Sequence, residues 1–214
     1  MVALCAVLAA LASPLAGGGL DGHLLELLIV ARSLAVAPSD PLDAAAVAVV
    51  ALDQRSLEAP ELAAIPRALM APEWATVLDA LFRAGARAVG FDLIFAYSGN
   101  RFRPDFDAPL LETLARHRRR VVLARSDATL PDVAFLGALR ANEEPDRLGL
   151  TSVQPDPDGV SRRLALVDAH TGQPTLAGAL ARAAGFSAMP AAVLLAPRRH
   201  LEALPAYSMV DVLR

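Results

Sequence analysis

Residues 81–95 read LFRAGARAVGFDLIF and contain, in order, the end of a helix, a glycine and a run typical of a buried strand. Gly85 stands where the helix would stop, because glycine readily takes the left-handed conformation that ends many helices. The run from Arg87 to Phe95 is mostly apolar and follows at once. A helix that leads through a glycine into a buried strand is typical of the repeating unit of α/β folds.

The same alternation extends from this stretch in both directions. Upstream, Ala46–Leu52 is an apolar, β-branched run that predicts a buried strand, and Pro72–Ala84 has the apolar spacing of a helix. Downstream, the pattern predicts a second helix at Asp105–His117 and a third strand at Arg120–Ala124. Strands that alternate with helices favour a parallel sheet covered by helices.

The last third of the chain departs from this alternation. Strand-like runs at 148–153 and 161–167 flank the segment QPDPDG, in which Asp158-Gly159 is a hairpin signal. We also expect a helix at 174–184, a short strand at 192–195 and a final helical turn at 209–213. The predicted fold is therefore an α/β, three-layer, Rossmann-like core of parallel strands with an antiparallel hairpin extension.

The N-terminal segment has a different character. Residues 1–20 carry no charged side chain, and about 20 helical residues are just long enough to cross a bilayer core. Pro14 and the glycines at 17–19 weaken a helix there, so a cleaved signal peptide, cut after Ala10-Leu11-Ala12, and a buried helix remain alternatives. We favour a membrane anchor. Residues 1–38 then form the anchor or signal and a lead-in helix, and residues 39–214 form the domain.

Composition excludes several classes of function. The net charge of −3 gives no reason to expect a nucleic-acid partner. The single cysteine, Cys5, excludes an intrachain disulfide and a multi-cysteine metal site. All the basic residues other than histidine are arginines, which removes mechanisms that need a lysine.

The short motifs predict no cofactor and no metal. Residues 17–22, GGGLDG, match the dinucleotide-binding spacing, but the run before them contains Pro14 and does not read as a strand. The four histidines match no local ligand spacing, and Asp156–Gly159 lacks the remaining ligands of a calcium loop. No hydrolase or phosphate-binding signature is present.

Two carboxylates follow predicted strands. Asp53 and Asp92 stand at or near the carboxyl ends of their strands, where open α/β sheets bind ligands. Arg55 lies beside Asp53, and Arg162 or Arg163 would arrive from the hairpin to place opposite charges at the same edge. These five residues are the predicted ligand-binding set. In the alternative interpretation, the carboxylates cap nearby backbone N–H groups.

The order of these segments resembles the second type of CHASE domain, the cyclase/histidine-kinase-associated sensing extracellular domain. The resemblance lies in VVALDQRSL at 49–57, in residues 81–95, in DPDGVSRRL at 156–164 and in PTLAGALA at 174–181. It covers about Asp40 to Leu213. A Trp-Pro-Trp-Pro-Arg stretch of the family is only echoed here by Ile65-Pro66-Arg67 and Trp74.

The resemblance implies an extracytoplasmic sensory domain of a bacterial membrane signalling protein, without catalysis of its own. We therefore expect an unknown small-molecule ligand, attachment to the cell membrane through the N-terminal segment, a periplasmic location and a possible homodimer. A rival hypothesis is a small α/β enzyme that uses Asp53 and Asp92 at the switch point of the sheet.

Overall fold

The structure is a computed structural model that describes residues 47–152, 161, 163–187, 189–194 and 205–214. The helices described below are α3 (Gln54–Glu58), α4 (Ala71–Arg83), α5 (Ala108–His117), α6 (Val133–Leu139), α7 (Leu176–Ala183) and α8 (Met209–Leu213), with 3-10 turns η1 (Arg67–Leu69), η2 (Gly99–Arg101) and η3 (Pro145–Arg147). The strands are β1 (Val49–Ala51), β2 (Val89–Phe91), β3 (Val121–Arg125), β4 (Leu148–Leu150), β5 (Arg163–Ala165), β6 (Ala192–Leu194) and β7 (Ala206–Ser208).

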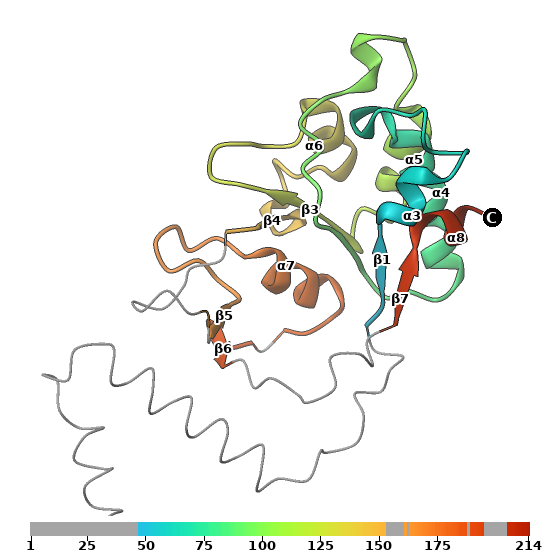
Figure 1. The fold of residues 1–214 in the computed structure, drawn as a ribbon. Helices are drawn as coiled ribbons and strands as arrows, with labels where there is room; N and C mark the ends of the chain where they lie inside the picture. Colours follow the sequence, from blue (N-terminus) through green and yellow to red (C-terminus); the bar gives the residue numbers. More distant parts are fainter. Residues whose placement is uncertain (1–46, 153–160, 162, 188, 195–204) are drawn as a thin grey trace, which may run out of the picture. The chain divides into compact units, whose positions relative to one another are not determined.

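Three parallel strands form the central sheet, in the order β2, β3, β4 (Figure 1). Helix α5 connects β2 to β3, and helix α6 connects β3 to β4, since parallel neighbours need a crossover. The predicted α/β class with parallel strands is confirmed. Helix α6 was not predicted; its N-cap is Asp132, whose side chain accepts a hydrogen bond from the Ala134 N–H at 3.1 Å.

Helix α4 begins with Pro72 in its first turn, and it buries Trp74, Val77 and Leu78, which share one face at helical spacing. Gly85 follows with φ of 92°, and the Ala86 N–H donates to the Leu81 carbonyl at 3.0 Å. This arrangement closes the helix and turns the chain toward β2. The helix and the glycine stop predicted from residues 81–95 are confirmed.

The two faces of the central sheet carry side chains of different size. On one face, Val121 and Leu123 belong to a buried core with Leu110 and Leu114 of α5. The opposite face carries Gly90 and Gly149, and α7 packs closely there. A Cβ atom added to Gly149 would lie 2.3 Å from the Cα of Leu176, so only glycine permits this approach. The sheet is thus the middle layer between helices.

The expected place of the first strand is wrong. The run 46–52 was predicted as a buried strand of the three-stranded core, but β1 pairs in parallel with β7, as Figure 1 also shows, and β4 is the third strand of the central sheet. Val49 is 41% exposed, so β1 is not buried on both faces. An apolar run indicates a strand but does not select the partner of that strand. The segment that forms β7 contains few residues with a strong preference for strands, so the sequence did not indicate it as the partner.

The antiparallel pairing also differs in position from the predicted hairpin. Strand β4 pairs with β3 and β5 pairs with β6, whereas the antiparallel bridge joins Val167 to Pro174. The proposed turn at Asp158-Gly159 lies outside the described residues. Leu150 of β4 is buried where this strand pairs in parallel with β3. Burial in the central sheet therefore explains why the β4 segment is apolar, and no hairpin partner is needed.

The contacts divide the chain into two compact units, of which the larger contains residues 48–152, 165–193 and 206–214. The network and the pocket discussed below lie within this larger unit. Within the described ranges, no helix is long and apolar enough to span a bilayer. The anchor predicted at residues 1–20 and the lead-in helix fall outside those ranges.

Candidate functional site

Asp53 begins helix α3. Its backbone is extended, with φ of −86° and ψ of 179°, and its Oδ1 accepts a hydrogen bond from the Ser56 N–H at 2.9 Å. This is the geometry of a helix N-cap, in which a short polar side chain satisfies a free N–H of the first turn. The capping interpretation of Asp53 is therefore realised in the structure.

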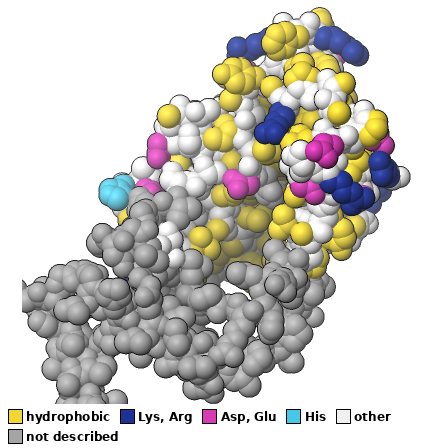
Figure 2. All heavy atoms as spheres, in the orientation of Figure 1, with side chains coloured by type: hydrophobic (Ala, Val, Ile, Leu, Met, Phe, Trp, Pro, Cys, Tyr) yellow, Lys and Arg dark blue, Asp and Glu magenta, His cyan; other side chains and the backbone are white. Residues whose placement is uncertain are grey.

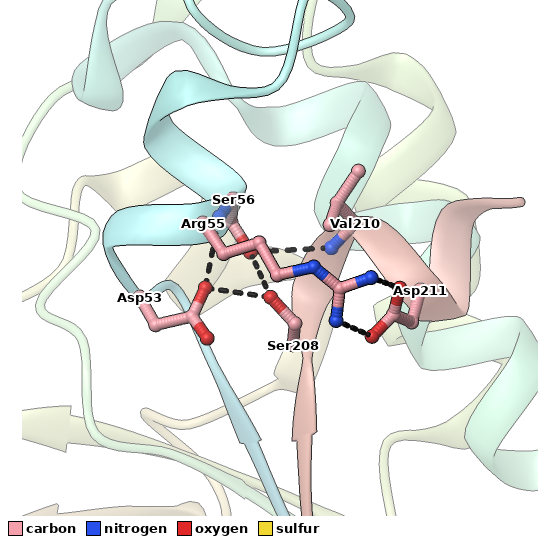
Figure 3. Close-up of polar contacts among 6 residues, drawn as sticks. All are labelled: Asp53, Arg55, Ser56, Ser208, Val210 and Asp211. Atoms are coloured by element: carbon pink, nitrogen blue, oxygen red, sulfur yellow. Dashed lines mark hydrogen bonds and ion pairs between the residues drawn. The ribbon is translucent and has the colours of Figure 1, made fainter.

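The same carboxylate reaches across to the other strand of the β1–β7 pair (Figure 3). The Ser208 hydroxyl donates to Asp53 Oδ1 at 2.6 Å, and it lies 2.9 Å from the Ser56 hydroxyl. The Val210 N–H donates to that Ser56 oxygen at 3.2 Å. Because Ser56 and Ser208 are buried, these bonds join α3 to the start of α8 away from water. We call these four residues the terminal network.

Hydrogen bonding in the terminal network lowers the pKa of Asp53 below its ordinary value of 3.8. The Ser208 hydroxyl is the main cause and the Ser56 N–H is the next, because both stabilise the charged carboxylate. Nucleophilic serines need a neighbouring base, and the network itself offers a fixed carboxylate but no imidazole. Its chemistry suits the joining of two chain segments better than catalysis.

Arg55 contributes a second link between the same elements. Its guanidinium donates two hydrogen bonds to the Asp211 carboxylate of α8, both at 2.7 Å (Figure 3). The side chains are 64% and 39% exposed, so water screens the pair and it contributes at most about 1 kcal/mol. The sequence pattern did not reveal this partner, because Asp211 lies far from Arg55 along the chain and no local pattern connects them.

The other predicted ligand-binding residues have different surroundings. Asp92 follows β2, is exposed, and makes no hydrogen bond or ion pair with the part of the chain that the structure describes. Arg163 is exposed on β5, and Arg162 lies outside the described residues. Asp53 and Asp92 follow strands of different sheets. Their joint contact with one ligand stays a prediction.

A pocket of about 220 Å³ opens beyond the carboxyl end of β2. Its walls come from η1 and the start of α4, from residues 93–97 after β2, and from Phe135 of α6. Tyr97 is 66% exposed at the pocket. Figure 2 shows arginine and apolar side chains gathered at the top of the visible face, over the segment that connects β2 to α5.

Aromatic rings make up much of the wall of this pocket. Phe95 and Phe135 both line the pocket, and their ring centroids lie 5.2 Å apart. Phe91 is buried and does not belong to the lining, but its ring centroid lies 5.8 Å from that of Trp74 and 5.4 Å from that of Phe95. Arg67 is the charged residue of the lining. The wall is therefore apolar, held by packed rings, with one cation at its edge.

The sequence pattern did not predict the pocket residues as a site. It assigned Trp74 to the buried face of a helix and Phe95 to the end of a strand. The strand ends at Phe91, however, so residues 93–97 form an apolar loop over the sheet edge. The one sequence signal for this loop was that the apolar run is longer than a usual strand of about 5–6 residues. An apolar pattern alone does not separate a strand from a loop.

The comparisons with known proteins identify one family. A protein-family model described as "CHASE2 domain" matches residues 2–214, almost the whole chain. This is the family that the sequence motifs resemble. No curated protein and no solved structure matches the chain.

Proposed function

Because the chain belongs to the CHASE2 domain family, we propose that it senses a small molecule by binding it in the pocket at the carboxyl end of β2. CHASE2 domains are extracellular sensory domains of signalling proteins, so the general role of this domain is sensory. The binding of a ligand at this pocket, and the lack of any catalytic step, are the parts that we propose.

The single observation that carries this proposal is the position and composition of the pocket. Ligands of open α/β sheets bind beyond the carboxyl ends of the strands, and binding sites are usually apolar hollows with a few polar groups. The pocket meets both conditions, with packed aromatic rings and Arg67 in its lining. The terminal network, by contrast, uses its polar atoms on one another.

The packing also offers a way for binding to be reported. Met70 and Trp74 line the pocket, and they belong to the same buried core as Met209 and Val210 of α8. A ligand that fits one arrangement of this core better than another would shift the population toward it. The terminal network would then carry the change from α8 to α3.

For the cellular setting we propose that residues 1–20 anchor the chain in the cell membrane and that the domain faces the periplasm. The extracellular character of the family supports this side of the membrane. We also propose that the domain forms a homodimer, which would suit a signalling role. No observation favours the rival enzyme that would use Asp53 and Asp92.

Thermal unfolding of the purified full chain tests the proposed function. We expect a low-molecular-weight bacterial extract to raise the unfolding temperature, because a molecule that binds only the folded state stabilises it. Ala96→Leu, which fills the pocket, should retain the fold and lose most of this shift. An equal shift in the wild type and in Ala96→Leu would place the binding elsewhere, and no shift from any extract would contradict ligand sensing.

A further inference from the structure

We propose that the pocket recognises a small organic carboxylate whose body is one aromatic ring or a short branched chain. This inference rests on the proposed function, because it names the class of molecule that the same pocket would take. It stands on the charge of Arg67, on the composition of the walls and on the volume of the pocket.

Arg67 is available to a ligand. It lies in η1, immediately before α4, and its side chain makes no hydrogen bond or ion pair with the described part of the chain. Arg101 in η2 is different, since it pairs with Asp132 at 2.9 Å. A guanidinium presents paired N–H donors that match a carboxylate, so a free Arg67 at an apolar pocket favours an organic anion.

The walls argue against other classes of ligand. Aromatic rings can bind an organic cation, but the described lining contains no carboxylate and Arg67 would repel it. Sugars need many polar partners, and part of the backbone here is already used. The Phe95 carbonyl accepts from the Asp132 N–H at 2.8 Å, and the Ala96 N–H donates to the Ile94 carbonyl at 2.8 Å.

The volume limits the size of the ligand. Pockets for drug-sized molecules measure roughly 300–1,000 Å³. A pocket of about 220 Å³ suits a smaller body. A ring or branched chain in contact with Trp74 and Phe135 would leave its carboxylate toward Arg67 at the edge.

Calorimetric titration of the full chain with phenylacetate and with its neutral analogue phenylacetamide tests the inference. We expect phenylacetate to bind at least tenfold more tightly than phenylacetamide, because a charge-assisted hydrogen bond is lost in the amide. Arg67→Gln should weaken phenylacetate binding by about the same factor and leave phenylacetamide unaffected. Arg83→Gln, at the opposite end of α4, is the matched control and should bind like the wild type.

Several results would overturn the inference. Equal affinity for the two probes would show that the pocket selects apolar bodies without regard to charge, and the proposed sensing function would stand. Phenylacetate binding that survives Arg67→Gln unchanged would exclude this arginine as the recognition group. Absence of binding by both probes, in a chain that still responds to the metabolite extract, would also reject this ligand class alone. If the chain binds neither probe and does not respond to the metabolite extract, the proposed function is contradicted as well.

Discussion

At the scale of single residues, the terminal network shows how one carboxylate can serve two segments of the chain. Asp53 caps α3 and also accepts from Ser208 of β7, so a local helix signal and a distant contact use the same oxygen. Capping was one of the two roles expected for Asp53, because aspartate is a common N-cap, although the helix α3 that it caps was not predicted. The partner Ser208 could not be predicted from the sequence, because no local pattern connects residues so far apart.

Removal of the Ser208 hydroxyl should destabilise the domain. In Ser208→Ala, Asp53 and the buried Ser56 hydroxyl each lose a partner, and we expect the free energy of unfolding to fall by about 1–2 kcal/mol. Chemical denaturation measures this change. Thr76→Ala removes an exposed hydroxyl and is the control, with an expected effect close to zero. Equal stability of the two variants would contradict a stabilising network.

The same variant should alter the acid dependence of stability. The pKa of Asp53 is below 3.8 in the folded state, so the unfolded chain binds more protons near that pH. The stabilisation by Asp53 is present above about pH 3.8 and is lost as the pH falls through the lower folded pKa. Ser208→Ala removes the main cause of the shift, so its stability should fall less steeply below pH 5 in denaturation measurements. A wild-type slope in the variant would contradict this.

His117 has a pKa below its ordinary value of 6.5, mainly because of burial and then because of Arg120. These effects outweigh the attraction of Asp79, at 3.7 Å. The unfolded chain therefore gains the proton first as the pH falls through 6.5, and the folded state loses stability from there to its lower pKa.

The substitution His117→Phe keeps a ring against Phe82, whose centroid lies 4.1 Å away, and removes the titration. We expect the unfolding temperature of the wild type to fall between about pH 7.5 and 5.5, and that of the variant to change less. Differential scanning calorimetry across this range checks the difference. Parallel profiles would show that His117 does not contribute.

At the scale of elements, the local sequence pattern predicted the positions of most individual helices and of two central strands. The helices α4, α5 and α7 and the strands β2 and β3 occur where apolar spacing and glycine stops placed them. The partner of β1 and the role of β4 were missed, since pairing is decided by contacts between distant segments. The apolar loop that forms the pocket was assigned to a strand, because an apolar pattern alone does not separate a strand from a loop.

The close packing of α7 on the central sheet gives a sharp test at this scale. A Cβ atom at Gly149 would lie 2.3 Å from a backbone atom of α7, so Gly149→Ala should lower the free energy of unfolding by about 2 kcal/mol or more. Gly137→Ala, in α6, meets nothing within 4 Å and is the control. It should stabilise the domain by about 0.5–1 kcal/mol, because alanine favours helix. Thermal or urea unfolding of both variants separates the two outcomes, and a harmless Gly149→Ala would contradict the described packing.

At the scale of the whole molecule, the chain is a sensory domain of the CHASE2 family whose described part is an α/β unit with its first and last strands paired. This pairing brings α3 and α8 together, so that a change in the core can affect both ends of the described unit. The family and the fold class could be predicted from the sequence. The pocket could not, because it is formed by segments from three places in the chain.

The membrane arrangement is a prediction at the same scale. Reporter enzymes fused after Ala37 should be active on the periplasmic side. The uncharged residues 1–20 would enter the membrane, and the extracellular character of the family gives the side, because a segment without charge gives the positive-inside rule little to act on. Fusions that are active only in the cytoplasm would contradict the proposed orientation. A fusion that starts at Asp40 and lacks the N-terminal segment is the control for reporter activity in the cytoplasm.

Hydrogen–deuterium exchange of the full chain, with and without the metabolite extract that raises its unfolding temperature, tests the central claim most directly. The account predicts slower exchange at residues 67–74 and 93–97, which line the pocket, and a smaller effect in α8, which shares its core. Protection confined to the region of Asp53 and Arg55, or the same exchange in both conditions across the pocket, would contradict it.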